Sequence, residues 1–138
     1  KIGTGDEVLN KPDILNRREE ILVREHPLKG TLFIVGIENL SHIVPVILHH
    51  HERWDGTGYP RGLAGTDIPL AARIFSVIDV YDAVTSERPY REPLDHASAM
   101  ELVREGSGTQ FDPDVVTGFA QAHGIAGGPD AWATDPIC

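Results

Sequence analysis

The sequence predicts an all-α fold, and three kinds of local signal lead to this class. The first is helical spacing, because apolar side chains recur every three or four positions through residues 69–86. The second is capping: Asn16, followed by Glu19, matches a capping box, and Asp95 precedes another segment of helical pattern. The third is punctuation, since clusters of glycine and proline separate these segments.

The N-terminal part of the chain is predicted to hold a turn and two helical segments. Asn10-Lys11-Pro12 has the composition of a turn. Residues 17–25 are predicted to be helical up to His26-Pro27, where proline disfavours a continuing helix. Residues 32–40 are apolar and fit either a helix or a strand by pattern alone, and their neighbours favour a helix.

The middle of the chain is predicted to contain two helices joined by a long loop. Residues 44–53 form a predicted helix that carries three consecutive histidines. Residues 55–69 are rich in glycine and proline and are predicted to be a loop. Residues 69–86 have the strongest helical pattern of the chain, and Arg88-Pro89-Tyr90 ends it.

Two shorter helices are predicted after this break. They cover residues 94–104 and 114–123, with a loop at 106–113 between them. The Gly-Gly-Pro and Asp-Pro steps after Gly124 predict a loosely ordered tail. The expected organisation is one helical domain over residues 1–123 and a tail over residues 124–138.

Composition excludes several classes of function. The 138 residues carry a net charge of −9 without any Lys/Arg-rich run, whereas a nucleic-acid groove is basic. A small anionic substrate is compatible with this charge if metal ions supply positive charge. The single cysteine, Cys138, allows no disulfide framework, and no apolar run reaches the ~20 residues of a membrane span. These features predict a cytoplasmic protein that does not insert into membranes.

Residues 49–60, HHHERWDGTGYP, carry the strongest chemical signal. Adjacent imidazoles repel one another when protonated, and when neutral they are strong ligands for borderline metals. Gly56, Gly58 and the Tyr59-Pro60 step then predict a loop directly after the histidines. This order predicts a metal site with a substrate-facing loop beside it.

Further ligand candidates lie on both sides of this segment. Asp79 and Asp82 are three residues apart and therefore share one helix face. Asp79 stands between Ile78 and Val80, so we expect it to be buried and to need a cation or several hydrogen-bond donors. Together with His26 before Pro27, these residues offer nitrogen and oxygen ligands suited to iron, manganese or zinc.

These residues also carry a family resemblance. Residues 50–60 read HHExxDGxGYP, and the chain resembles the HD-GYP domains, a branch of the HD superfamily of metal-dependent phosphohydrolases, which share this signature. Further matching motifs lie in the family's order along residues 1–120: KIG at 1–3 as the end of HDxGK, LNKP at 9–12, HPxxG at 26–30, DVYDA at 79–83, TSxRPYR at 85–91 and GTQFDP at 108–113.

The resemblance implies a helical bundle, a cluster of two or three metals, and hydrolysis of the bacterial messenger cyclic di-GMP to pGpG or GMP. The metal would be iron or manganese, with zinc as an alternative. The resemblance further implies three groups of site residues: metal ligands His26, His50, His51 and Asp79; catalytic residues Lys1 and Asp82; and substrate-binding residues Asp55, Tyr59, Arg88 and Arg91. The loop that ends at Pro60 would also contact partner signalling domains, such as GGDEF-type or receiver domains.

One departure from the family concerns its defining His-Asp pair, which would stand just before Lys1 and is not in this chain. We therefore expect a bundle truncated at its N-terminal side, exposed apolar surface, self-association through that surface, and partial metal occupancy. The alternative function is a non-catalytic remnant or an interaction module that binds partner domains through the GYP loop.

Several residues of the signature region have a plainer interpretation. His42, His49, His96 and His123 match no ligand position and are interpreted as surface or packing residues. Glu52 is expected to orient a ligating histidine rather than to bind metal itself. Arg88 and Arg91 either bind phosphate or are ordinary surface charges.

Overall fold

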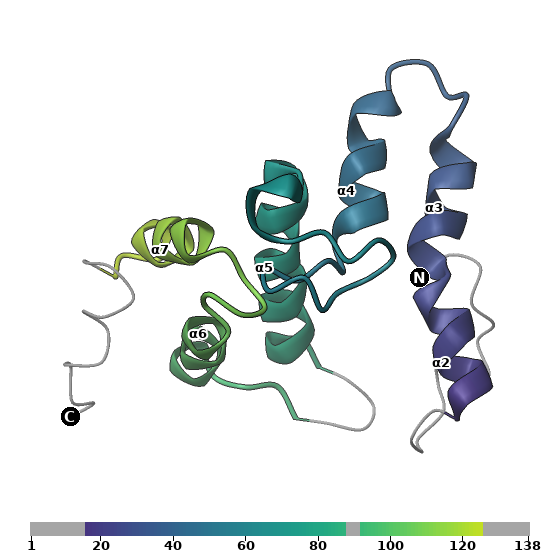
Figure 1. Ribbon diagram of the computed structural model, residues 1–138. Coiled ribbons are helices and arrows are strands. Elements are labelled where there is room, and N and C mark those ends of the chain that lie inside the picture. Colours follow the sequence, from purple (N-terminus) through teal and green to yellow (C-terminus); the bar gives the residue numbers. More distant parts are fainter. Residues whose placement is uncertain (1–15, 88–91, 126–138) are drawn as a thin grey trace.

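The computed structural model describes residues 16–87 and 92–125 and arranges them as an all-α structure (Figure 1). Lys1, Arg88, Arg91, the turn at 10–12 and the tail from residue 126 lie outside the described residues. The helices are α2 (Arg17–Arg24), α3 (His26–Ile34), α4 (Val44–His49), α5 (Leu70–Thr85), α6 (His96–Glu105) and α7 (Pro113–Ala122), with short 3-10 turns at Ser41–Ile43 and Gly65–Asp67. The described ranges contain no strand, and the predicted fold class is confirmed.

The first two helices follow each other almost without interruption. The capping box at the start of α2 is confirmed, because the Asn16 side chain accepts from the backbone of Glu19 while the Glu19 carboxylate accepts from the backbone of Asn16. His26-Pro27 ends α2 as expected, but it also begins α3, since proline in a first helical turn needs no N–H partner. The helix predicted for residues 32–40 is wrong beyond Ile34, where positive φ angles at Gly36 and Asn39 turn the chain.

The helix predicted over residues 44–53 is shorter than expected, because α4 ends at His49. The ring of His50 bonds through Nδ1 to the carbonyl oxygen of Ile47 (2.8 Å), and the N–H of Glu52 donates to His49 in a tighter turn (3.0 Å). A side chain that bonds to the backbone three residues earlier competes with regular helix. His50 and His51 therefore lie in the turn after α4 rather than on a continuing helix.

Helix α5 is the central element and packs against α4, α6 and α7 (Figure 1). The core lies between α5 and the two C-terminal helices, where Val77, Val103, Phe111 and Val116 are at most 1% exposed. Phe111 packs directly over Gly106, where a Cβ atom would come within 2.6 Å of the ring. This packing anchors the face of α5 opposite to its contact with α4.

Polar contacts complete the attachment of the C-terminal helices. Asp95 caps α6 as predicted, accepting from the N–H of Ser98. The buried Asp112 caps α7 and also accepts a 2.5 Å hydrogen bond from Arg73 of α5. Because Asp112 is 3% exposed, this ion pair is largely removed from water and couples α5 to α7.

Helices α2, α3 and α5 also present apolar side chains to solvent within the described ranges, in agreement with the expected exposed apolar surface. The exposed members include Leu32 and Phe33 on α3 and Ile74, Phe75 and Ile78 on α5. Asp79 is exposed as well, so its predicted burial is wrong. Its neighbours Ile78 and Val80 are apolar, but Asp79 lies at an open pocket, where its side chain stays exposed. No helix in the described part of the chain has the length and apolar character needed to cross a membrane.

Candidate metal centre

Three histidines from two segments converge beside α5. His26 is the first residue of α3, while His50 and His51 lie in the turn after α4, which packs against α3. Nε2 of His26 is 3.4 Å from Nε2 of His50 and 3.2 Å from Nε2 of His51. One nitrogen from each ring lies within 4.8 Å of the others, so the three side chains can bind one metal ion.

The backbone orients two of these rings. Nδ1 of His26 is 2.6 Å from the carbonyl oxygen of Val23, and Nδ1 of His50 is 2.8 Å from that of Ile47. Because a carbonyl oxygen only accepts, Nδ1 carries the proton in both neutral rings, and the Nε2 lone pairs face each other. Two facing lone pairs repel unless a cation lies between them, so this donor set fits a divalent metal.

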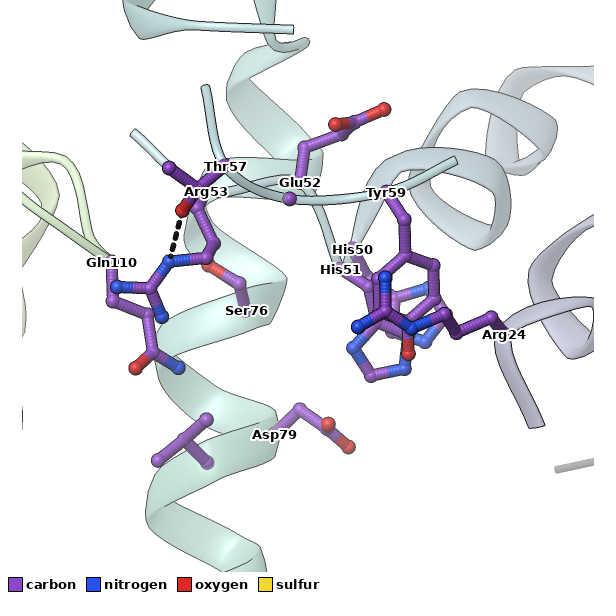
Figure 2. Close-up of a pocket in the computed structure, with 12 residues that line it drawn as sticks. Arg24, His50, His51, Glu52, Arg53, Thr57, Tyr59, Ser76, Asp79 and Gln110 are labelled. Atoms are coloured by element: carbon purple, nitrogen blue, oxygen red, sulfur yellow. Dashed lines mark hydrogen bonds between the residues drawn. The ribbon is translucent and has the colours of Figure 1, made fainter. Parts of the chain in front are cut away.

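His50 and His51 open into a pocket of about 240 Å³ (Figure 2). Tyr59 stacks on His51 with ring centroids 4.9 Å apart, and Phe75 meets the His50 ring edge-on at 5.7 Å. Asp79 projects from α5 into the same pocket, although its carboxylate is not part of the group of ligand atoms within 4.8 Å. The pocket therefore combines imidazole nitrogens, the carboxylates of Glu52 and Asp79, and the aromatic ring of Tyr59.

Tyr59 acts as a neutral wall rather than as a base. Burial raises the pKa of Tyr59 above its ordinary value of 10.0, the positive charge of Arg24 opposes this shift, and the negative charge of Asp79 adds to it. A phenol with a raised pKa stays protonated at neutral pH. Tyr59 can thus donate a hydrogen bond and offer its ring face, but it cannot accept a proton from water there.

Glu52 holds the loop that carries Tyr59. Its side chain is fully buried, Oε1 accepts from the N–H of Arg61 (2.8 Å), and Oε2 accepts from the N–H of Leu63 (3.0 Å). The histidine beside it is His49, with Nδ1 3.5 Å from Oε1, and His49 is not in the metal group. Glu52 therefore orients the loop and faces His49, and its expected role in orienting a ligating histidine stays a prediction.

Gly58 explains why the loop requires glycine at this position. A Cβ atom there would lie 2.3 Å from the backbone nitrogen of Arg53 and 2.6 Å from the carbonyl oxygen of His51. These neighbours are backbone atoms and cannot rotate away. Only glycine allows the loop to lie directly on the turn that carries the histidines.

Two other predicted site residues lie outside the lining of the pocket. Asp55 is exposed, and its carboxylate accepts from the hydroxyl and the N–H of Thr57. These two hydrogen bonds, with a smaller effect of Arg53, lower the pKa of Asp55. Asp82 is exposed on α5 and accepts from the hydroxyl of Ser86 at 3.4 Å. Their roles toward substrate stay predictions.

The pocket also includes residues that the sequence did not single out. Arg24 reaches it from the end of α2, and Gln110 from the loop before α7. Arg24 stands only two residues before His26, so proximity in sequence was an available signal. Gln110 is brought there by the hydrogen bond between its carbonyl oxygen and the N–H of Trp54 (3.2 Å), which no local pattern predicts.

Comparison with known proteins identifies the family. The profile of the HD domain matches residues 2–115, which is most of the chain. The chain belongs to the HD domain family. The signature at residues 50–60 and the relatives described next make it an HD-GYP-type domain. HD domains depend on metal, and the three converging histidines can supply a metal site.

Three curated relatives illustrate the similarity of this HD domain to known proteins. A cyclic di-GMP phosphodiesterase of Pseudomonas aeruginosa is 47% identical over 91% of the chain and 30% of its own length. The cyclic di-GMP phosphodiesterase response regulator RpfG of Xanthomonas campestris is 41% identical over 92% of the chain and 35% of its own length. A 3'3'-cGAMP-specific phosphodiesterase of Vibrio cholerae is 35% identical over 96% of the chain and 32% of its own length. The chain thus spans about a third of each of these relatives.

Proposed function

We propose that this chain is the metal-binding part of a phosphodiesterase that hydrolyses cyclic di-GMP to pGpG or GMP. The observation that carries the proposal is the convergence of the Nε2 atoms of His26, His50 and His51. The Nε2 lone pairs of His26 and His50 face each other. Cyclic di-GMP is favoured over 3'3'-cGAMP because the two relatives named for it are more similar to this chain.

We further propose iron or manganese as the metal, with zinc as the alternative. Imidazole nitrogens suit all three ions, and the site offers no thiolate that would favour zinc strongly. Magnesium is less suited, since it prefers oxygen ligands. Asp79, which faces the same pocket, is proposed as the carboxylate ligand that completes the set.

The residues of the pocket have separate tasks in this proposal. When bound, a divalent ion makes a water molecule more acidic and relieves charge on the phosphate oxygens. His26 and His50 are held for that task by the carbonyls of Val23 and Ile47, which keep their Nε2 atoms directed at one point. Tyr59 covers His51 and limits access of solvent. Lys1, Asp55, Asp82, Arg88 and Arg91 keep their expected roles at the substrate as proposals.

The proposal is tested by loading the chain with manganese or iron and measuring hydrolysis of cyclic di-GMP and of 3'3'-cGAMP. We expect turnover of cyclic di-GMP, and His51→Ala should lower it by about 100-fold together with the metal content. His42→Ala is the matched control, because His42 is exposed and lies outside the metal group. Binding of cyclic di-GMP without hydrolysis by the metal-loaded chain would overturn the proposal in favour of the interaction module.

A further inference from the structure

Arg24 lines the pocket but does not belong to the group of proposed metal ligands. It is the last residue of α2, and its guanidinium carbon is 5.2 Å from the centre of the Tyr59 ring. That ring stacks on His51, whose Nε2 is 3.2 Å from Nε2 of His26. Arg24, Tyr59 and His51 thus form consecutive layers that end at the metal group (Figure 2).

Two contacts hold this guanidinium without using up its donors. Nη2 donates to Glu20 one helical turn earlier (2.8 Å), and both side chains of that pair are more than half exposed. Tyr59 contributes its ring face, which attracts a cation but accepts no conventional hydrogen bond. Because a guanidinium has five N–H donors, most of them are available to an anion in the pocket.

The second arginine of the pocket lining is engaged differently. Arg53 donates through Nε to the hydroxyl of Thr57 (2.9 Å) and pairs through Nη2 with Asp55 at 3.5 Å. Both contacts lie within the loop, so Arg53 stabilises the loop conformation. Among the described residues that line the pocket, Arg24 is therefore the arginine positioned to receive an anion beside the histidines.

A cation in addition to the metal favours the binding of a phosphate at this site. Asp79 faces the pocket, and the whole chain carries a net charge of −9, so both repel an incoming phosphate. Arginine presents paired donors that match two oxygens of a phosphate group. The ring of Tyr59 and the carboxylate of Glu20 restrict where this side chain can turn, which lowers the entropy lost on binding.

We propose that Arg24 is a substrate-binding residue that receives a non-bridging phosphate oxygen at the mouth of the histidine pocket. The proposal rests on the phosphodiesterase function, since it names a residue of that same site. It assigns Glu20 and Tyr59 as positioning residues for the guanidinium. It also predicts that the phosphate contact depends on the end of α2, which lies beside the metal-binding turn after α4 but is not part of it.

The test combines a kinetic and a binding measurement on the full manganese-loaded chain. Arg24→Gln should raise the KM for cyclic di-GMP about tenfold with a smaller change in kcat, because one charge-assisted contact is lost. It should weaken binding of inorganic phosphate, measured by calorimetry, by a similar factor while metal content stays unchanged. Arg24→Lys should lie between the wild type and Arg24→Gln, since it keeps the charge and loses the fork.

Arg18→Gln is the matched control, because Arg18 is an exposed arginine on the same helix and is not in the pocket lining. It should leave KM, phosphate affinity and metal content unchanged. Unchanged phosphate affinity in Arg24→Gln would overturn the inference, and so would an equal loss in Arg18→Gln. If the wild type binds phosphate but hydrolyses no cyclic di-GMP, the phosphodiesterase proposal fails, while the phosphate measurement still decides the role of Arg24.

Discussion

Replacing Glu52 with Gln tests whether a buried carboxylate holds the loop against the histidine turn. The side chain of Glu52 is 0% exposed, and its two oxygens accept from the backbone N–H groups of Arg61 and Leu63. Gln has the same shape but only one acceptor oxygen. Its NH₂ group must therefore face one of the two backbone N–H groups, which is then left without an acceptor.

The expected loss in the free energy of unfolding follows from the one hydrogen bond that Gln cannot accept. A hydrogen bond to a charged group contributes about 1.5–3 kcal/mol, and a buried unsatisfied donor costs about 1–3 kcal/mol. These two energies must not be added, because both describe the same lost hydrogen bond. Removal of the buried charge offsets part of the loss. We therefore expect Glu52→Gln to lower the free energy of unfolding by about 2–3 kcal/mol.

Urea unfolding followed by circular dichroism measures this change. For a slope of roughly 1–3 kcal/mol/M, the midpoint should fall by about 0.7–3 M. Glu105→Gln is the matched control, since Glu105 is exposed at the end of α6, and it should stay within about 0.5 kcal/mol of the wild type. An unchanged midpoint for Glu52→Gln would refute the conclusion that this carboxylate anchors the loop.

Three further predictions concern other parts of the fold. Gly58→Ala should destabilise the protein by about 3 kcal/mol and weaken metal binding, because the added Cβ would meet backbone atoms. Gly118→Ala is the control: Gly118 lies in a helix with open space around it, so this change should stabilise the protein by about 0.5–1 kcal/mol in the same urea titration. Asp112→Asn should cost about 3–5 kcal/mol, because it leaves the charge of Arg73 without its buried partner; a midpoint shift no larger than that of an exposed Asp→Asn change would contradict this. Hydrogen bonds from the backbone and hydroxyl of Ser98 lower the pKa of Asp95 below its ordinary value of 3.8, so its contribution is present above pH 3.8 and is lost as the pH falls through the lower folded-state pKa. The stability difference between wild type and Asp95→Ala should accordingly shrink between pH 6 and pH 3, and a pH-independent difference would contradict the assignment.

Local signals in the sequence were sufficient for the all-α class, for the helix caps and for the imidazole residues of the site, but not for the bounds of every helix. Asn16 and Asp95 cap helices through side-chain bonds to residues at most three positions away, so a short window contains the whole interaction. The paired histidines before a Gly/Pro-rich loop likewise predicted an imidazole cluster. The ligand roles within that cluster stay proposals, although the structure does bring His26, His50 and His51 together.

Tertiary structure decided which face of α5 is covered and how the pocket is closed. Asp79 looked buried from its apolar neighbours, but burial depends on what packs against a helix face, and this residue lies at an open pocket. Glu52 became a loop anchor because its acceptors meet N–H groups nine and eleven positions away. Arg24 reached the pocket because the loop folds back to place Tyr59 against the end of α2. Each of these outcomes depends on contacts between segments distant in sequence, which local propensity and hydrophobic pattern do not encode.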